Sequence, residues 1–418
     1  MKTLLYFEEY ESVLSHKLLN RKDIKPVIIR TNKNMKFFND EYLKETANVL
    51  HYEIDYYNDL DEEVTKFKKW LTDNNIQLDY FLNDSEYYLE FSNKFARKLG
   101  LEALSDEQIG WVRDKVNMKE RFREIGLDTV DFSKIDSKEE LKKFFIENGS
   151  KKIIFKPRRG MNSIDTYKID SLEDIDNLEI DIVPNKYMAE DFCYDHEWSI
   201  ESLVQDGKVL DSYVTYIPNP TIWATISNDL NCHMTVPKVP DYFQFVPKDF
   251  IQQIVSGMNL KDGVMTIEVF ISNDGKVKAS ELGWRLPGCQ ATTNHSYSYG
   301  IDIYNILLDI AMKNKVDLVY RDRIISVGDL YLPNKEGIIE KVTPLEDLLN
   351  MDGVIDGEMF VEVGKYQKKR RVGNDASGWV QVKGIDEKDT LQKMQQVFDA
   401  FEIEVTKDKG AKQYVKTI

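Results

Sequence analysis

A hairpin predicted in residues 265–288 constrains the fold most strongly. The segment MTIEVFISNDGKVKASELGWRLPG has two runs rich in β-branched and apolar residues, separated by Asp274-Gly275. That pair suits the positive φ angles of a two-residue hairpin loop. In this register Glu268 lies directly across from Glu281, with Cβ atoms about 5 Å apart. The residues that can face the core on the other side are Ile267, Val269, Ile271 and Leu282.

The two facing acids require an explanation. Like charges opposed on a sheet are destabilising, and each acid tends to retain a proton unless a cation compensates the pair. A hard divalent ion such as Mg²⁺, bound together with nucleotide phosphates, is one compensator. A solvated hairpin face whose acids point into water is the other interpretation, and the hairpin alone favours neither. Arg285 shares the parity of Glu281, and Gly283 leaves open space beside the acids.

Composition indicates a folded protein of two to four domains. The chain has 418 residues, of which 42% are hydrophobic and 31% charged. Its net charge of −16 argues against broad binding to nucleic acid or to an anionic membrane. Cys193, Cys232 and Cys289 are too scattered for a disulfide framework, and no CxxC or HExxH spacing indicates zinc. The absence of a long apolar run and of a signal-peptide core predicts a cytoplasmic protein.

Secondary structure can be predicted along most of the chain. Residues 1–95 alternate apolar runs with helical stretches such as 61–71, which is typical of a small α/β domain with a largely parallel sheet. No GxGxxG element indicates a dinucleotide role. A single helix is predicted from the cap Ser105 to Gly126, with apolar residues at helical spacing.

The remaining elements are predicted to be mainly strands. We expect strands at 151–157, 166–169, 325–333, 357–363 and 378–384, a hairpin turning at Asp206-Gly207, a long loop over 217–240, and helices at 300–312 and 387–398. A long loop in a compact domain is more often functional than decorative.

Five motifs in order resemble those of the ATP-grasp superfamily. They are RDKVNMK at 113–119, IIFKPRRGMNSIDTYKI at 153–169, YMAEDFCYDHEWSIE at 187–201, the strand of Glu268, and ELGWRLPG at 281–288. Within that superfamily the chain resembles the carboxylate–amine ligases similar to L-amino acid ligases. The resemblance covers residues 100–312 in motif order, and more weakly the whole chain in domain order.

The resemblance implies an α/β (α+β) ATP-grasp fold with three parts. These are an N-terminal Rossmann-like pre-ATP-grasp domain at 1–98, an ATP-grasp domain at 99–320, and a β-rich C-terminal domain at 321–418. Two subdomains of the second part would clamp ATP, with a hinge near 188–194.

The resemblance also assigns nucleotide contacts. Lys115 and Lys156 would approach the phosphates, beneath a covering loop that contains Gly160, Asn162 and Ser163. This loop has fewer glycines than is usual in the family. Arg158 and Arg159 could help to hold phosphate, but at least one is expected to be an exposed basic turn residue. Glu190 with the backbone of Asp191 and Cys193 would bind adenine, and Glu197 would bind the ribose hydroxyls.

Glu268 and Glu281 would bind one or two Mg²⁺ ions, or Mn²⁺, that bridge the phosphates of ATP. Gly283 stands where the family has an asparagine ligand, so a water could complete the second metal's coordination. Arg285, a planar and permanently charged donor, could clamp the transferred phosphoryl group, which makes Arg285 and Lys156 the expected catalytic residues.

Residues 289–300 are expected to line the substrate pocket through Asn294, His295 and Tyr297. Trp223 and Trp284 are expected to pack in the core. We expect the His196 ring to be hydrogen-bonded locally, and the basic run at 365–373 to form a solvated hairpin.

The resemblance implies an ATP-dependent ligase that joins a small carboxylate to an amine through an acyl phosphate and releases ADP and phosphate. Its partners would be small molecules, without nucleic acid or membrane, and a homodimer is possible. Two alternatives are a carboxylase resembling biotin carboxylase, and a non-catalytic nucleotide-binding protein of the same fold.

Overall fold

The N-terminal part of the computed structural model is a parallel sheet. The structure describes residues 1–149, 151–219, 224, 227–236, 246, 247, 249–320, 325–369 and 375–406. Strands β1 (Lys2–Phe7), β2 (Ile24–Thr31), β3 (Leu50–Ile54) and β4 (Tyr80–Asn83) pair in the order β3-β2-β1-β4, and every pair is parallel. This confirms the predicted parallel sheet. Its helical elements are α1 (Val13–Asn20), η1 (Met35–Phe37), α2 (Asp40–Glu45), α3 (Leu60–Asp73) and α4 (Leu89–Lys98).

The single helix predicted after Ser105 is wrong, because the chain forms two helices. They are α5 (Asp106–Arg113) and α6 (Lys115–Glu124), and Asp114 between them has φ −101° and ψ 107°. The Asp114 carboxylate accepts the N–H groups of Val116 and Asn117, so it caps α6. Ser105 starts α5 with a capping box, as predicted. The apolar spacing continues through the break, which is why periodicity alone did not reveal it.

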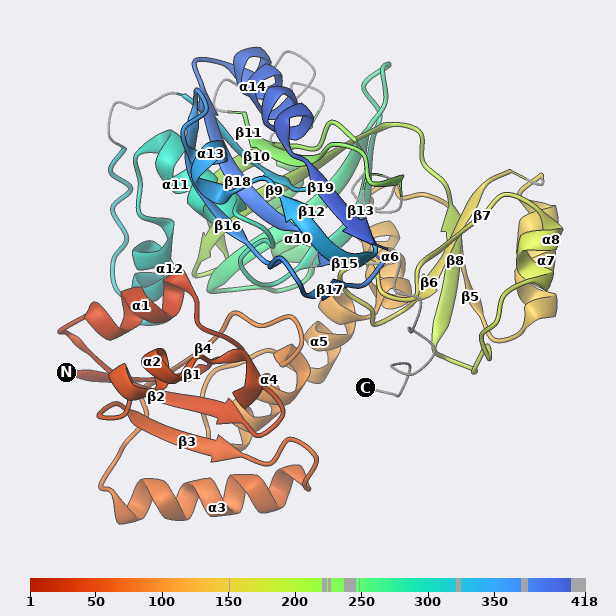
Figure 1. The fold of residues 1–418 in the computed structure, drawn as a ribbon. Helices are drawn as coiled ribbons and strands as arrows, with labels where there is room; N and C mark the ends of the chain where they lie inside the picture. Colours follow the sequence, from red (N-terminus) through yellow and green to blue (C-terminus); the bar gives the residue numbers. More distant parts are fainter. Residues whose placement is uncertain are drawn as a thin grey trace.

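A small antiparallel sheet follows. Strands β5 (Phe132–Ile135), β8 (Tyr187–Asp191), β6 (Ile153–Pro157) and β7 (Tyr167–Ile169) pair in that order. Helices α7 (Lys138–Glu147) and α8 (Leu172–Asp176) cover its outer face, at the far right of Figure 1. The predicted strands at 151–157 and 166–169 are confirmed.

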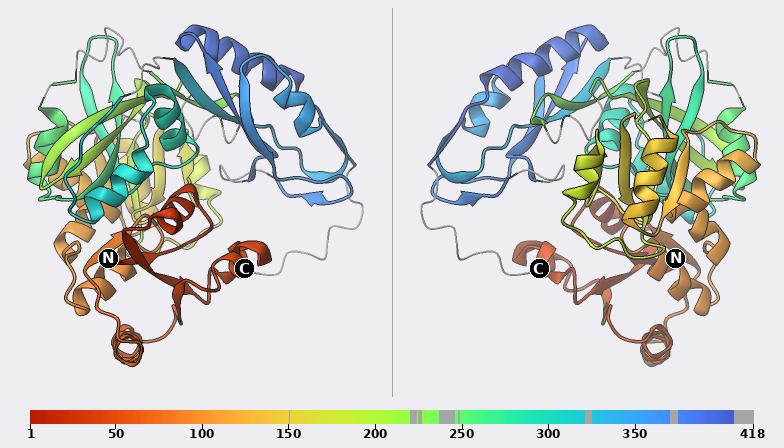
Figure 2. Two further views of the ribbon diagram at one scale, coloured as in Figure 1. Left: turned by 90° about the vertical axis from the view of Figure 1, so that its left-hand side faces the viewer. Right: turned by 90° about the vertical axis from the view of Figure 1, so that its right-hand side faces the viewer.

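The largest sheet has eight antiparallel strands in the order β13-β12-β9-β10-β11-β14-β18-β16. Its members are β9 (His196–Gln205), β10 (Lys208–Tyr216), β11 (Asn231–Thr235), β12 (Gly263–Ile271), β13 (Val277–Gly283), β14 (Ser326–Tyr331), β16 (Val354–Met359) and β18 (Gly378–Gly384). Strands near the C-terminus therefore continue the sheet that carries the hairpin, as the views in Figure 2 show.

Strand β11 corrects the prediction of a continuous loop over 217–240. All five of its residues are buried, and the strand pairs with β10 on one side and β14 on the other. Its second partner lies about a hundred residues away in the sequence, so no local pattern revealed the strand. Part of the predicted loop, including Trp223, lies outside the described residues.

The hairpin predicted in residues 265–288 is present, but its loop has three residues and not two. The Ser272 N–H donates to the Lys276 carbonyl at 3.0 Å, and Gly275 has φ +83°. The pairing of β12 with β13 also shifts by one residue between Ile267 and Val269. In contrast, the turn at Asp206-Gly207 has two residues with φ +50° and +72°, as predicted.

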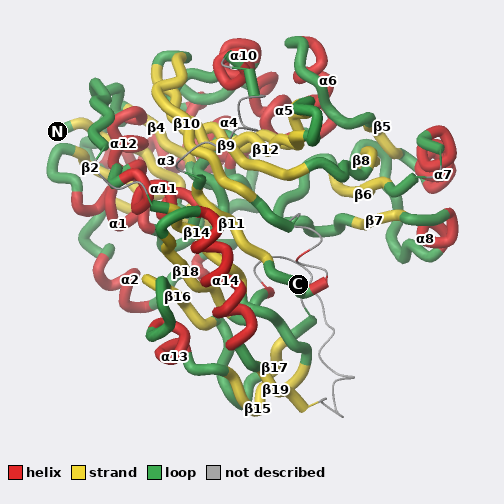
Figure 3. Tube along the Cα trace, turned by 90° about the horizontal axis from the view of Figure 1, so that it is seen from above, coloured by secondary structure: helices red, strands yellow, loops and turns green. Residues whose placement is uncertain are grey.

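Helices α10 (Phe250–Gly257), α11 (Ala291–Tyr299), α12 (Ile303–Ala311) and α14 (Glu387–Ala400) pack against strands of the large sheet. In the view of Figure 3, α14 lies along β14 and β18. A three-stranded sheet, β17-β15-β19, completes the chain. The remaining elements are α13 (Leu345–Leu349), β15 (Gly337–Val342), β17 (Tyr366–Gln367) and β19 (Ile403–Thr406). Among the described residues, no helix has the length and apolar character needed to cross a membrane.

Candidate nucleotide and metal site

A cleft of about 330 Å³ lies where the small sheet faces the hairpin end of the large sheet. The residues predicted to bind nucleotide or metal, or to act in catalysis, all line it: Lys115, Lys156, Gly160, Asn162, Ser163, Glu190, Asp191, Cys193, Glu197, Glu268, Glu281 and Arg285. They come from α6, β6, β8, β9, β12 and β13, with adjoining loops. The fold thus gathers residues up to 170 positions apart around one cavity.

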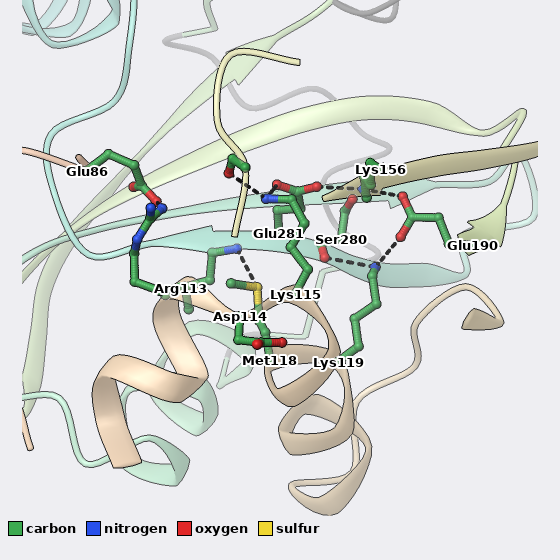
Figure 4. A network of polar contacts seen from close by, with 12 residues as sticks. Glu86, Arg113, Asp114, Lys115, Met118, Lys119, Lys156, Glu190, Ser280 and Glu281 are labelled. Atoms are coloured by element: carbon green, nitrogen blue, oxygen red, sulfur yellow. Dashed lines mark hydrogen bonds and ion pairs between the residues drawn. The ribbon is translucent and has the colours of Figure 1, made fainter. Parts of the chain in front are cut away.

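Two lysines hold the Glu281 carboxylate. Its Oε1 lies 2.6 Å from Lys156 Nζ, and its Oε2 lies 2.7 Å from Lys115 Nζ (Figure 4). Burial disfavours the ionised form of Glu281, but the two ammonium groups outweigh it and hold its pKa well below the usual range. The cation expected beside this acid is therefore supplied by the chain itself.

Glu268 lies in the opposite electrostatic situation on the same hairpin. Burial, together with the neighbouring Glu281 and Glu197 carboxylates, raises the pKa of Glu268 from 4.5 to about 8. Glu268 therefore retains a proton at neutral pH, as expected for one of two neighbouring acids. The two acids fit a hard divalent ion, because they offer oxygen ligands and the ion would stabilise the second negative charge.

Lys119, which the sequence reasoning missed, lies directly beneath this cluster. Its side chain is fully buried, and its Nζ lies 3.1 Å from Glu190 Oε2 and 3.0 Å from the Ser280 carbonyl (Figure 4). Lys156 pairs with the other oxygen of Glu190. Lys119 follows Lys115 by four residues on one helix, a spacing that puts both on the same face and could have identified it.

Two of the groups predicted to contact adenine already have partners within the protein. The Glu190 carboxylate lies between Lys119 and Lys156. The Asp191 N–H donates to the Asp131 carbonyl at 2.9 Å. A nucleotide would thus meet this strand mainly through groups other than that N–H.

Arg285 is paired with an acid from the N-terminal part of the chain. Its Nε lies 2.9 Å from Glu86 Oε2, and the other Glu86 oxygen pairs with Arg113. Burial, then the nearby positive charge of Arg285, lowers the pKa of Arg113 to about 10. A Cβ at Gly283 would lie 3.6 Å from Glu86 Oε2, so this carboxylate borders the space where the family has an asparagine. Sequence reasoning missed Glu86 because it follows β4, far from the motifs.

The loop after β6 is held in a specific conformation. Asn162, Ser163 and Asp165 have φ between +52° and +57°, which is uncommon for residues other than glycine. The Gly160 carbonyl accepts a hydrogen bond from Lys115 Nζ at 3.2 Å.

The two arginines before this loop are paired with acids. Arg158 bonds to Asp114 at 2.9 Å, and Arg159 lies 2.6 Å from Glu90. Half of the Arg159 side chain is exposed, in agreement with the expected exposed basic turn.

Cys289 and Ala291 of the predicted pocket segment 289–300 border the cleft, but Asn294, His295 and Tyr297 do not. The wall of the cleft at this point is formed by residues 287–289 and Ala291. Asn294 donates to Asp329 at 2.7 Å, and His295 bonds to Glu201 at 2.7 Å, both in buried positions. Helix α11 turns these side chains toward the large sheet.

The other minor predictions have mixed outcomes. Trp284 packs against the core, as expected. His196 bonds to Asn273 at 3.3 Å, also as expected. Residues 370–373 of the basic run lie outside the part of the chain that the structure describes.

Comparisons with solved structures identify the fold. An L-amino acid ligase from Bacillus licheniformis superposes with a TM-score of 0.74 at 17% identity, over 97% of this chain and 99% of that one. A carboxyaminoimidazole ribonucleotide synthase from Aspergillus clavatus, solved with ATP, gives 0.70 at 15% identity, over 95% and 97%. The chain therefore has the ATP-grasp fold.

Sequence similarity identifies a narrower group of relatives than the fold does. Residues 330–406 match the family described as L-amino acid ligase C-terminal domain 2. The L-arginine-specific L-amino acid ligase of Bacillus subtilis is 20% identical over 264 residues, which are 61% of this chain and 62% of that relative. The match thus spans less than two thirds of the curated relative's length. Among ATP-grasp proteins, this chain is similar to the L-amino acid ligases.

Proposed function

We propose that the protein is an ATP-dependent carboxylate–amine ligase that forms an amide bond between amino acids or other small carboxylates and amines. The observation that carries this proposal is the convergence of Lys115, Lys156, Glu268 and Glu281 on one cleft. Such a reaction demands little covalent chemistry from the protein, so positioning and charge compensation would dominate catalysis.

The lysines would exchange partners when nucleotide binds. In the structure Lys115 and Lys156 neutralise Glu281. Phosphate oxygens would draw both ammonium groups away, and Glu281 and Glu268 would then be free to act as metal ligands. Mg²⁺ held there would neutralise phosphate charge. Lys119 stays buried against Glu190 in this scheme and keeps that strand in place.

Arg285 would meet the transferred phosphoryl group or the acyl phosphate. Its side chain lies in the cleft, with Nε on Glu86 and Nη1 on the Leu286 carbonyl at 2.5 Å. A fixed guanidinium of this kind suits phosphate oxygens, which it can contact with two parallel donors. The substrate carboxylate would attack the γ-phosphate of ATP and release ADP, and the amine would then displace phosphate from the resulting acyl phosphate, leaving the amide and inorganic phosphate.

We also propose several finer properties of the protein. They comprise one or two metal ions, possible replacement by Mn²⁺, a homodimer, a cytoplasmic location, and a division at 1–98, 99–320 and 321–418. The β11–β14 pairing carries the large sheet across the last boundary, so we expect the second and third parts to unfold together.

The test is ADP release from Mg-ATP across a panel of amino acid pairs, with product masses measured in parallel. Glu281→Gln and Arg285→Ala should each lower turnover by roughly 100-fold or more, as expected for loss of a preorganised charged group. Glu102→Gln, which alters an exposed acid outside the cleft, should retain activity.

Near-normal turnover in either cleft variant would contradict the assignment. ADP release that depends on bicarbonate and not on an amine would favour a carboxylase. Binding of ATP without turnover on any tested pair would favour a non-catalytic nucleotide-binding protein.

A further inference from the structure

Two potential metal ligands face each other on neighbouring strands of the large sheet. His233 on β11 and Asp329 on β14 are register partners, and both are buried. His233 Nδ1 lies 3.4 Å from Asp329 Oδ2. That separation is long for a hydrogen bond, but it matches the roughly 3.4 Å between two ligand atoms of a tetrahedral zinc ion with bonds of about 2.0–2.1 Å.

A cysteine completes the cluster from a third element. Cys289 lies in the loop between β13 and α11, and its Sγ, the His233 ring nitrogen and the Asp329 oxygen all lie within 4.8 Å of one another. Cys289 is exposed and borders the cleft together with His233. Neighbouring Cys232 is excluded as the ligand, because it packs into the apolar core on the other face of β11.

The carboxylate is oriented from behind by a buried hydrogen-bond chain. Asn294 Nδ2 donates to Asp329 Oδ1 at 2.7 Å, and Gln381 Nε2 donates to Asn294 Oδ1 at 2.6 Å. All of these side chains are buried. Metal-binding carboxylates are commonly fixed by such outer hydrogen bonds, which leaves Oδ2 of Asp329 directed to the His233 side.

We propose that His233, Cys289 and Asp329 bind one zinc-class transition-metal ion whose fourth position opens to the cleft. Imidazole, thiolate and carboxylate are ligands that Zn²⁺ accepts, and three protein ligands with one open position are typical of accessible zinc sites. A thiolate and a carboxylate together cancel the charge of a divalent ion. Closing the site requires that the exposed Cys289 loop bring its sulfur to the ~2.3 Å zinc–sulfur distance.

This site is separate from the hairpin acids, and it does not depend on the proposed ligase activity. Its ligands come from three distant segments, so no CxxC or HExxH spacing in the sequence reveals it. Oxygen-only ligands at Glu268 and Glu281 suit Mg²⁺, whereas the sulfur and nitrogen here select a softer ion.

The test uses Co²⁺ as a spectroscopic probe on the full-length protein after removal of bound metal with a chelator. Wild type with one equivalent of Co²⁺ should show thiolate-to-cobalt charge-transfer absorbance, and Zn²⁺ should abolish it stoichiometrically. Cys289→Ser should lose the charge-transfer band. His233→Ala should bind Co²⁺ at least about 100-fold more weakly, and Asn294→Ala about 10-fold or more weakly, as outer-shell changes do.

Controls separate this site from other thiols and from misfolding. Cys193→Ser, which alters a different cysteine of the same cleft, should keep the full charge-transfer band. Circular dichroism should show that Cys289→Ser is folded, since the residue is exposed. Absence of the band in wild type, or its persistence in Cys289→Ser, would overturn the proposal.

Discussion

Replacing Glu268 by glutamine should stabilise the nucleotide-free protein at alkaline pH. The pKa of Glu268 is raised in the folded state to about 8, so the folded protein binds this proton more tightly than the unfolded chain does. Stability contributed by the protonated acid is therefore lost as pH rises between about 4.5 and 8. Glutamine mimics the protonated acid and does not titrate, so the variant escapes that loss.

The magnitude follows from the same pKa. A rise from 4.5 to about 8 corresponds to about 5 kcal/mol as an upper bound. Glu268 is partly open to the cleft, and solvent there reduces the effect. We expect Glu268→Gln to exceed wild type by about 2 kcal/mol in free energy of unfolding at pH 9, and most of this advantage to vanish at pH 5.5.

The matched control is Glu281→Gln on the same hairpin, for which the opposite sign is expected. The pKa of Glu281 is depressed, so its ionised form stabilises the fold above the unfolded pKa and its contribution is lost only in acid. Glu281→Gln leaves Lys115 and Lys156 without this anion, and it should cost about 3 kcal/mol at both pH values.

The assay is urea denaturation at pH 5.5 and pH 9, with EDTA and without nucleotide. A Glu268→Gln variant that is destabilised at pH 9, or two variants that change stability with the same sign, would refute the electrostatic account. Both variants should also lose the thermal stabilisation that Mg-ATP gives to wild type.

Three further predictions concern the residues around the hairpin. Lys119→Met should lower the free energy of unfolding by about 3 kcal/mol, because buried Glu190 loses one of its two cations. In urea denaturation the double variant Lys119→Met/Glu190→Gln should lose less free energy of unfolding than the two single variants lose together. Strictly additive losses would contradict the pairing of Lys119 with Glu190. Asp114→Ala should cost about 1–2 kcal/mol by the same assay, whereas Asp114→Asn, which preserves the helix cap, should cost less; equal losses would argue against the cap. Lys156→Met should weaken ATP binding by about 10-fold or more in calorimetry, and unchanged affinity would exclude its phosphate role.

The residues around the cleft could be predicted because their chemistry shows in local sequence. Lys156 ends an apolar strand before a polar loop, and Glu268 and Glu281 flank a turn, so each carried its own signal. Their meeting in one cleft followed from motif order. The Glu281 counter-ions did not follow, because ion pairing between α6, β6 and β13 depends on how the two sheets pack.

The predictions that failed share a dependence on distant contacts. Strand β11 exists because β14 pairs with it from far along the chain. The bulge beside Glu268 arises where β12 pairs with β13 and β9 at once, a constraint absent from the hairpin sequence. Helix α11 buries Asn294 and His295 against Asp329 and Glu201, which are buried acids on other strands. Only the start of this polar segment, at Cys289 and Ala291, thus borders the cleft, and the rest forms a helix packed on the large sheet.

The proposed function requires that a carboxylate bound in this cleft is activated by phosphorylation. The most direct measurement uses amino acids labelled with ¹⁸O in the carboxylate, supplied with Mg-ATP and unlabelled bicarbonate, followed by mass spectrometry of the released phosphate. We expect one ¹⁸O atom in each released phosphate, together with ADP and an amide that has lost that oxygen. Unlabelled phosphate, or AMP in place of ADP, would contradict it.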